Sequence, residues 1–512
     1  MRIESVTFGE FKNLSGVPIE FHGDETTSVV VGRNGTGKSN LLEGLAIIFR
    51  DLDLGRPSDL DFEIRYRCRG ETVEVKSKNR RSSAFVDGER AKVTDIRDPE
   101  SGLRPDFVFG YYSGPTNRFE KIFLAHERQF YAALLANEMP PLRRLFFARP
   151  HHSQFVLLAF ATAQDEAIEE VLRSELRIDA IESVTFVLQE PPWAANSDPH
   201  DFWGARGTVR AFLEEVRDRS LPLTPISESI ETRTRASRAV ERAYLHLSSP
   251  NELVDLSGLY EDNRGFFSAL ESMTLSDLIH EVRVDVRVLD SSKPLEFREL
   301  SEGEQQLLVV LGLLQFTAQD EALYLLDEPD THFNPAWSLR FTHLARRFLE
   351  PAVNSHLVMA THDPLVIADL TRDQVLLFER DDSGQVTVSS PIEDPRGQGI
   401  AGLLTSEIYG LRSQLDLTTL NLLDRKRLIS TKKTLTKSER AELKDLNERL
   451  WNIDAASIVR DPFYSRWAEA YGREAAEENL LKPVLSGEEL KRQEELALEI
   501  LAQLEADRGE AQ

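Results

Sequence analysis

Short apolar runs of strand length occur near the start of this chain and again after its midpoint. The runs TTSVVVG (residues 26–32), ALYLL (322–326) and HLVMA (356–360) lack the polar alternation of a half-exposed strand. Runs of this kind are typical of strands that are buried on both faces of a parallel sheet. The first run is followed by NLLEGLAIIFRDL (40–52), which has the spacing of an amphipathic helix. The pattern therefore predicts an α/β fold.

A second group of strands is predicted within the first 115 residues of the chain. FEIRYRCR (62–69) and ETVEVKSK (71–78) alternate like the two arms of a β-hairpin. RIESVTF (2–8) and DFVFGYYSG (106–114) also have strand character. We therefore expect residues 1–115 to form a β-rich first lobe.

The pattern turns helical between residues 116 and 284. EKIFLAHERQFYAALLA (120–136) and AQDEAIEEVLRSEL (163–176) have helical spacing, and prolines interrupt the segment repeatedly. Because prolines end or kink helices and no sustained heptad pattern is present, a long coiled-coil arm is not expected. We predict a compact, mainly helical insertion here.

The remainder of the chain divides into a second α/β stretch and a helical tail. Strand character returns at EVRVDVRVLD (281–290) and continues to QVLLFER (374–380), after which helical patterns dominate. The tail contains two capping-box sequences that begin helices, Thr436 with Glu439 and Ser486 with Glu489. The predicted division into first lobe, insertion, second lobe and tail is residues 1–115, 116–284, 285–394 and 395–512.

Composition sets few further limits on the class of protein. Hydrophobic residues make up 41% and charged residues 29% of the chain, and no run approaches the ~20 apolar residues of a membrane-spanning helix. The start lacks the basic-then-apolar layout of an export signal. Cys68 is the only cysteine. No disulfide can form within the chain, so we expect a reducing compartment, the cytoplasm, and no membrane partner.

The net charge of −25 argues against general attraction of the whole surface to nucleic acid. Two local basic segments leave a nucleic-acid groove open as an alternative. Their residues are Arg65, Arg67, Arg69, Lys76, Lys78, Arg80 and Arg81 in the predicted hairpin, and Arg425, Lys426, Arg427, Lys432, Lys433 and Lys437 in the tail. The simpler interpretation of each segment, a solvated face balanced by nearby acids, is favoured.

The first run ends in a sequence with the pattern of a phosphate-binding loop, GRNGTGKSN. Its glycines let successive backbone amides point at phosphate oxygens, and the helix that follows adds its positive end. Lys38 would neutralise the β- and γ-phosphates, and Ser39 would bind Mg²⁺. The candidate nucleotide-binding residues are Gly32, Arg33, Asn34, Gly35, Thr36, Gly37, Lys38, Ser39 and Asn40.

Two further buried strands end in chemically useful side chains. ALYLL is followed by Asp327 and Glu328 at the carboxyl end of its strand, where α/β sheets place their ligands. Asp327 can hold Mg²⁺, and Glu328 can polarise a water for in-line attack on the γ-phosphate. His362 follows the HLVMA strand and precedes a proline-marked turn, which makes it a candidate γ-phosphate contact.

A helix that is otherwise apolar begins at ELSEGEQQ (299–306) with acidic, amide and hydroxyl residues. Such residues are unfavourable in a buried helix unless this end must contact something negative. The hydroxyl of Ser301 and the backbone amides around Gly303 would meet that need. The candidate residues of this signature are Ser301, Glu302, Gly303, Glu304 and Gln305.

Together these motifs resemble the ABC-type ATPases, and among them the branch of SMC and RecF proteins. The matching stretches are FKNLSGVPIEF, GRNGTGKSN, LSEGEQQ, LLDEPDTHFNP and ATHDP. The resemblance covers roughly residues 1–115 and 285–380. It implies an α/β fold of the ABC-type P-loop ATPase class, with a mainly helical insertion and tail, that uses ATP and Mg²⁺. The long coiled coil of SMC proteins is missing.

The resemblance also implies that two copies of the chain share each nucleotide. In that family the signature binds the γ-phosphate held by the phosphate loop of a partner subunit. One phosphate loop and one signature per chain imply a head-to-tail homodimer at least, with a higher oligomer left open. The loop that crosses between the two sites corresponds to DTHFNP (330–335), with Asp330 and Asn334 as candidates.

Two family features correspond less clearly to this sequence. The adenine contacts would fall near Phe11, Lys12 and Asn13. The glutamine that contacts Mg²⁺ should follow DFVFGYYSGPTNRF (106–119), but the nearest candidate is Gln129. This distance leaves open how nucleotide is coupled to the insertion.

The sequence of the tail helps to distinguish among the families that contain a similar ATPase. Nucleases with a Toprim domain need a glutamate and a D-x-D pair at strand ends, and the sequence after Arg380 offers no such strand. No nuclease site is therefore predicted in this chain. The tail resembles those of the ATPase subunits of Septu and of Septu-like retron antiphage systems, in which a separate HNH-type nuclease cuts.

Two functions remain in competition. The first is an ATP-hydrolysing regulatory subunit that controls a separate nuclease in a defence complex. The second is a RecF-like repair ATPase that binds DNA directly. The acidic charge and the lack of a coiled-coil arm favour the first. A purely structural protein would leave the catalytic set without a role.

Overall fold

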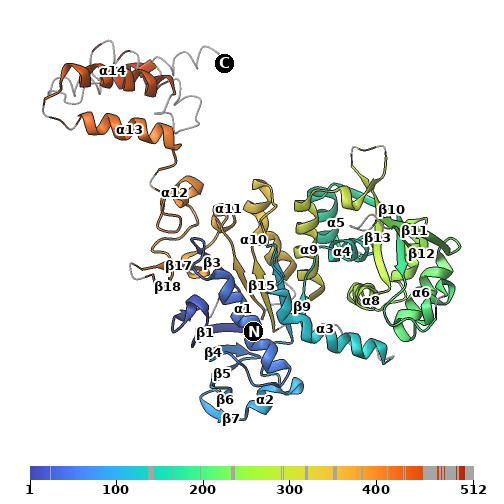
Figure 1. Cartoon of the computed structure of the whole chain (residues 1–512). Helices are drawn as coiled ribbons and strands as arrows, with labels where there is room; N and C mark the ends of the chain where they lie inside the picture. Colours follow the sequence, from blue (N-terminus) through green and yellow to red (C-terminus); the bar gives the residue numbers. More distant parts are fainter. Residues whose placement is uncertain are drawn as a thin grey trace. The chain divides into compact units, whose positions relative to one another are not determined.

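The computed structural model describes most of residues 1–501 (Figure 1). Its gaps are residues 23–24, 137–142, 164, 197, 232–236, 290, 292, 318–320, 350–353, 382–383, 412, 431, 433, 454–466, 468–469, 472–473, 475–477, 479–491 and 493–494, and it ends before residue 502. The chain forms two compact units, Met1–Gly410 and Leu411–Gln512. Within the described part, no helix is both long enough and apolar enough to span a bilayer.

A seven-stranded sheet forms the centre of the first unit (Figure 1). Its strands, in spatial order, are β18 (Val386–Ser389), β17 (Val375–Arg380), β3 (Thr27–Gly32), β16 (His356–Ala360), β15 (Ala322–Asp327), β8 (Phe107–Tyr112) and β9 (Leu145–Phe147). Neighbouring strands run parallel except β17 and β18. The predicted α/β fold is confirmed.

The register of this sheet gathers the ends of four strands at one edge. Asp327 pairs with Ala360 on one side and with Tyr112 on the other, and Ala360 pairs with Val30 of β3. Because parallel strands point the same way, the segments that follow β3, β8, β15 and β16 emerge together. The phosphate loop, Glu328 and His362 all belong to these segments.

The sheet is buried on both faces, as the apolar runs predict. Val30 and Leu325 belong to the core that also contains the apolar face of α1 (Lys38–Asp53). Leu326 belongs to the opposite core, which includes α9 (Glu302–Thr317). Adjacent residues of one strand thus enter different cores, because side chains alternate across a sheet.

A second, antiparallel sheet adds to the core that contains α1. Its strands, in spatial order, are β2 (Pro18–Glu20), β1 (Arg2–Phe8), β4 (Phe62–Cys68), β5 (Glu71–Lys78), β6 (Arg81–Val86) and β7 (Glu89–Ala91). The predicted hairpin is the pair β4–β5, and the short α2 (Val93–Arg97) follows β7. Apolar side chains of β4 and β5 are buried beside those of α1, so this sheet positions the helix that follows the phosphate loop.

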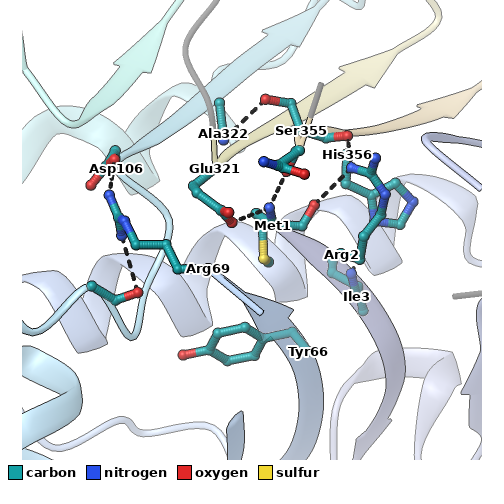
Figure 2. Close-up of polar contacts among 12 residues, drawn as sticks. Met1, Arg2, Ile3, Tyr66, Arg69, Asp106, Glu321, Ala322, Ser355 and His356 are labelled. Carbon is teal, nitrogen blue, oxygen red and sulfur yellow. Dashed lines mark hydrogen bonds and ion pairs between the residues drawn. The ribbon is translucent and has the colours of Figure 1, made fainter. Parts of the chain in front are cut away.

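Polar contacts join the first strand to the central sheet (Figure 2). The Met1 amine donates to the Glu321 carboxylate, and the Arg2 guanidinium donates to the carbonyl of Ser355. The backbone N–H of Ile3 donates to Nδ1 of His356 over 3.1 Å. These contacts tie β1 to the amino ends of β15 and β16, opposite the edge where the functional segments emerge.

The insertion contains a third sheet, which the prediction of a mainly helical segment missed. Its strands, in spatial order, are β11 (Thr224–Glu231), β12 (Ser237–Leu247), β10 (Ile178–Gln189), β13 (Ile279–Val288) and β14 (Leu295–Glu296). The helices of the insertion are α3 (Glu120–Leu135), α4 (His152–Ala161), α5 (Glu166–Glu170), α6 (Gly207–Arg219), α7 (Pro250–Ser257) and α8 (Asn263–Leu275). The central strand of this sheet, β10, pairs with β12 and β13, which lie far away in the sequence. The helical spacing of the segments between them gave no indication of this pairing.

The insertion joins the second lobe through helix packing. α4 lies against both α8 and α9, and α9 also contacts α10 (Pro335–Leu349) (Figure 1). These helices share one apolar core with the central sheet. The insertion is therefore packed onto the signature helix and is not a separate body.

The tail begins later than the sequence pattern indicates. We placed its start at residue 395, but α11 (Pro364–Ile367) contacts α12 (Gly399–Thr405), and Leu403 and Ile408 are buried in the main core. The second unit starts at Leu411. Sequence patterns mark helices but not which core they join.

The second unit contains two neighbouring helices, α13 (Leu417–Ser430) and α14 (Lys437–Asn452). α13 packs on α14 around a small apolar cluster. The predicted capping box at Thr436 is confirmed, because its amide and hydroxyl donate to the Glu439 carboxylate over 2.9 Å each. The pair Ser486 and Glu489 lies outside the described residues.

Candidate nucleotide-binding site

The loop between β3 and α1 turns sharply at Gly32. This residue has a φ of 144°, and a Cβ there would lie 2.2 Å from the carbonyl oxygen of Phe378 on the neighbouring strand. Only glycine tolerates both the conformation and the contact. The loop that follows ends at Gly37, where α1 begins with Lys38.

Lys38 lies inside the curve of this loop. Its ammonium donates to the carbonyl oxygens of Gly32 (2.8 Å) and Arg33 (3.3 Å), and the residue is only 5% exposed. Burial lowers the pKa of Lys38 to about 8, while the carboxylates of Glu328 and Asp327 oppose this shift. An anion at the loop would favour the charged form of this amine.

Two side chains outside the loop hold its tip. Asn13 and Arg380 both donate to the carbonyl of Gly35, over 2.9 and 2.6 Å. Asn40 donates to Asn13 over 2.7 Å, and Lys12 donates to Asn40 over 3.2 Å. Lys12 and Asn13, which we expected to contact adenine, therefore support the phosphate loop in this structure. Arg380 was not anticipated, because it lies far away in the sequence.

Asp327 and Ser39 face each other at the carboxyl end of β15. The Ser39 hydroxyl donates to Asp327 Oδ1 over 3.1 Å. Burial raises the pKa of the Asp327 carboxyl to about 6, and the hydrogen bond from Ser39 opposes this shift. A cation beside this carboxylate would relieve the cost of its burial.

The chemistry of this pair fits Mg²⁺. The ion prefers oxygen ligands and keeps several waters, so one carboxylate, one hydroxyl and phosphate oxygens suffice to hold it. The described residues contain no cluster of three or more His, Cys, Asp and Glu side chains that could hold a metal by themselves. A site completed by the phosphates of a nucleotide is consistent with both observations.

Glu328 is held in an unusual backbone conformation beside His362. Its φ is 52°, and its backbone N–H donates to the carbonyl of Ala360 over 2.8 Å. His362 Nε2 lies 3.3 Å from Glu328 Oε1. This hydrogen bond is the main reason why the pKa of the Glu328 carboxyl is lowered. A non-glycine residue held at positive φ in a cleft is typical of a functional site.

These residues line one open cavity of about 370 Å³. Its lining comprises Asn34, Gly35, Gly37, Lys38, Ser39, Asn40, Tyr112, Arg118, Glu328 and His362. Tyr112 and Arg118 were not predicted, since no motif marks them; Tyr112 is the last residue of β8, and Arg118 lies in the segment between β8 and α3. Gln129 is exposed on α3 and does not line the cavity.

The predicted signature lies at the start of α9 and outside this cavity. The hydroxyl and amide of Ser301 donate to the carboxylate of Glu304 over 2.6 and 2.8 Å, which forms a capping box. Glu302 is exposed, and Gln305 donates to the carbonyl of Leu300 over 2.9 Å. Helix capping alone thus accounts for Ser301 and Glu304 within one chain.

The signature packs closely on the loop after β15. A Cβ at Gly303 would lie 2.3 Å from the carbonyl oxygen of His332, so only glycine fits here. Gln306 accepts from the backbone N–H of His332 over 3.0 Å and donates to the carbonyl of Glu328 over 3.5 Å. Gln306 therefore links the start of α9 to the loop that carries Glu328.

The two residues predicted to reach a partner chain differ in exposure. Asp330 is buried and accepts a hydrogen bond from the hydroxyl of Thr361, and burial raises its pKa to about 6. Asn334 is exposed, and its side chain accepts from the backbone N–H of Trp337 at the start of α10. Asn334 is therefore accessible to a partner chain, whereas Asp330 is not.

Acidic neighbours pair with most of the basic side chains in the first basic segment and with two of those in the tail segment. In the first, the pairs are Arg65 and Arg67 with Glu4, Arg69 with Asp106, Lys76 with Glu63 and Glu74, and Arg80 with Asp59. In the tail, Arg425 pairs with Glu442, and Lys432 with Glu439. Lys433 lies outside the described residues. The arrangement favours solvated, balanced faces.

Comparison with known proteins identifies relatives of this chain. The family model described as "AAA domain, putative AbiEii toxin, Type IV TA system" matches residues 28–368. Septu protein PtuA of Bacillus mycoides (strain KBAB4) is 22% identical over 201 residues, which are 37% of this chain and 28% of that protein. Retron Vc95 probable ATPase of Vibrio cholerae serotype O1 biovar El Tor is 24% identical over 157 residues, 28% of this chain and 29% of that protein.

The resemblance to Septu and retron ATPases is thereby confirmed, although the chain matches less than a third of the length of each relative. Solved structures similar to this chain include an SMC head bound to the C-winged helix domain of ScpA (TM-score 0.33, 15% identity, 76% of this chain and 97% of that one). The SMC head domain from Thermotoga maritima has a TM-score of 0.32, with 14% identity, 76% and 99% coverage. RecF-ATP has a TM-score of 0.28, with 14% identity, 71% and 92% coverage. Structural similarity at these TM-scores is too low to assign the fold. The fold assignment is based on the strand order of the central sheet.

Proposed function

The chain belongs to the family described as "AAA domain, putative AbiEii toxin, Type IV TA system", and from this premise we propose that it binds and hydrolyses ATP as the regulatory subunit of a bacterial antiphage defence complex. One observation carries the ATPase proposal. Lys38, Glu328 and His362 come from three different strand ends and line one cavity with the phosphate loop. Such a convergence of a phosphate loop, an acid and a polar sensor suits phosphoryl transfer to water.

Each residue has a defined task in this reaction. The loop amides and Lys38 bind the phosphates. Ser39 and Asp327 would hold Mg²⁺, and this ion would neutralise part of the phosphate charge when bound. Glu328 orients the attacking water and accepts its proton, and its lowered pKa keeps the carboxyl ionised so that it can accept a hydrogen bond from that water. His362 fixes the position of that carboxylate through the 3.3 Å contact.

We propose further that two chains complete each other's sites. The signature of one chain is not part of its own nucleotide cavity, yet Ser301 and Glu302 are exposed at a helix amino terminus, where an anion is favoured. A head-to-tail homodimer would bring this terminus to the γ-phosphate held by the other chain. In that state phosphate would compete with the Glu304 carboxylate for Ser301.

The regulatory part of the proposal rests on the relatives. Because their names denote Septu and a retron ATPase, we propose that this chain acts in a comparable defence system with a separate nuclease, of HNH type. The second unit or the insertion would dock this partner, and an assembly larger than a dimer is compatible with the proposal. The single cysteine, Cys68, is compatible with a reducing cytoplasm. Gene neighbourhood offers a direct check, because a nuclease gene should lie next to this one.

The alternative, a RecF-like ATPase that clamps DNA directly, has less support. The first basic segment is largely paired with acids of the same chain, Arg425 and Lys432 of the tail segment are paired too, and the net charge is −25. DNA binding by a basic groove would weaken steeply as salt is raised. We expect no such binding by the purified protein between low and physiological salt, and strong salt-dependent binding would favour the alternative.

Two substitutions test the ATPase proposal, one expected to affect nucleotide binding and the other expected to affect turnover. Lys38→Ala should abolish nucleotide binding, because it removes the cation inside the phosphate loop. Glu328→Gln should leave binding intact and slow turnover by about 10²–10⁴-fold, the range typical of losing a general base. Calorimetry with ATP and a phosphate-release assay measure the two effects. Unchanged turnover in Glu328→Gln would contradict the role given to that carboxylate.

A further inference from the structure

Arg118 lines the nucleotide cavity although it belongs to no motif. It lies in the segment between β8 and α3, close behind Tyr112, the last residue of β8. Tyr112 pairs directly with Asp327 in the central sheet. This segment is where the family glutamine was expected, and Gln129 does not fill that place. An arginine therefore occupies the side of the cavity formed by the end of β8.

The guanidinium of Arg118 is only loosely engaged by its own chain. It lies 5.8 Å above the ring of Tyr112, and its nearest carboxylate among the described residues is Glu43, at 3.9 Å. That carboxylate already accepts a hydrogen bond of 2.5 Å from Lys12. The side chain of Arg118 is 43% exposed. Most of its donors are therefore available to another anion.

The position of Arg118 in the cavity indicates which part of a nucleotide it would meet. The loop amides and Lys38 lie at the β3 side, whereas Glu328, which must reach the attacking water, comes from β15 beside β8. The phosphate under attack must lie next to Glu328 and thus on the side where Arg118 stands.

We propose that Arg118 binds the terminal phosphate of ATP from within the same chain and so makes the site prefer nucleoside triphosphate over diphosphate. A guanidinium suits this role because its planar donors match phosphate oxygens and its charge is permanent. The proposal rests on the ATPase function proposed above. The opposing interpretation is a surface arginine that stacks on Tyr112 without contacting nucleotide.

The test compares affinities for a non-hydrolysable ATP analogue and for ADP, each measured with Mg²⁺ by calorimetry. Arg118→Met should weaken binding of the analogue about 10- to 100-fold, the loss expected for a hydrogen bond to a charged group, and change ADP binding less than about twofold. Arg118→Lys should recover part of the loss because it retains the charge. Arg128→Met, on the exposed face of α3 outside the cavity, is the matched control and should bind both nucleotides normally.

The same measurement in a Ser301→Arg background separates contacts within the chain from contacts supplied by a partner. Arg118→Met should cause the same loss there, because the proposed contact does not need a second chain. An equal loss for both nucleotides, or no loss for either, would overturn the proposal. Failure of the unaltered protein to bind any nucleotide would instead overturn the ATPase function itself.

Discussion

At the scale of single residues, burial sets the protonation of the polar groups that hold the central sheet together. His356 Nδ1 accepts the backbone N–H of Ile3, so Nε2 carries the proton and donates to the hydroxyl of Ser28 over 2.9 Å. Desolvation, with added repulsion from Arg2, lowers the pKa of His356 to about 3. The ring is therefore neutral in the folded protein, and this tautomer joins β1 to β3 through β16.

Stability should fall on acidification because of this histidine. An unfolded histidine titrates near pH ~6.5. Between that pH and about 3, only the unfolded state binds the proton at this position. The free energy of unfolding should therefore decrease by up to about 1.4 kcal/mol per pH unit as pH falls through this window, and the contribution is fully present above it. In His356→Gln the free energy of unfolding, measured by urea titration at each pH, should decline less steeply by up to that amount.

Met359→Ala is the control for this prediction. Met359 is a fully buried residue of the same strand, so the change lowers stability without removing a titrating group. Its pH dependence should parallel that of the unaltered protein. Equal slopes for the His356 variant and this control would show that His356 is not the source of the acid sensitivity.

At the scale of elements, the residues that cap the start of α9 include Ser301, which we propose to bind phosphate. Ser301 and Glu304 form a capping box that satisfies the first amides of the helix. Thr436 and Glu439 form the same box at the start of α14, which belongs to the second unit. The two boxes have the same local structure, so any difference between them reports the function proposed for the signature.

Ser301→Ala and Thr436→Ala should each lower the stability of their helix by about 1 kcal/mol, the usual cost of losing such a cap. Only Ser301→Ala should also slow ATP turnover, by about 10- to 100-fold, because it removes a hydrogen bond to a charged phosphate. Thermal unfolding followed by circular dichroism and a phosphate-release assay measure both effects. If turnover falls no further in Ser301→Ala than in Thr436→Ala, Ser301 is only a helix cap.

The sequence predicted the candidate site best where a chemically distinctive motif directly follows a recognisable strand. The runs before Gly32, Asp327 and His362 identify strands and place their functional residues at strand ends, and the register confirms that these ends meet. The sheet of β10 to β14 could not be read in this way, because its central strand β10 pairs with β12 and β13, which helices separate from it in the sequence. Arg118 was missed for a related reason, since only the folded sheet brings the end of β8 beside Asp327.

At the scale of the whole molecule, the first unit carries the residues that we propose for nucleotide binding but does not bring all of them together. The phosphate loop, Glu328 and His362 line one cavity, Asp327 contacts Ser39 of that lining, and the signature lies outside the cavity. Gln306 nonetheless connects the signature helix to the carbonyl of Glu328 and to the backbone of His332. A phosphate bound at Ser301 by one chain could thus affect the catalytic loop of that same chain.

Complementation between two inactive variants tests the shared site most directly. Lys38→Ala and Ser301→Arg chains should each be inactive alone, because every site in either homodimer lacks one half. A mixed dimer contains one intact site, formed by the phosphate loop of the Ser301→Arg chain and the signature of the Lys38→Ala chain. An equal mixture should therefore recover about a quarter of the normal ATP turnover. No recovery in a mixture whose mixed dimers are verified by native mass spectrometry, or full activity of the Ser301→Arg chain alone, would contradict a site built from two chains.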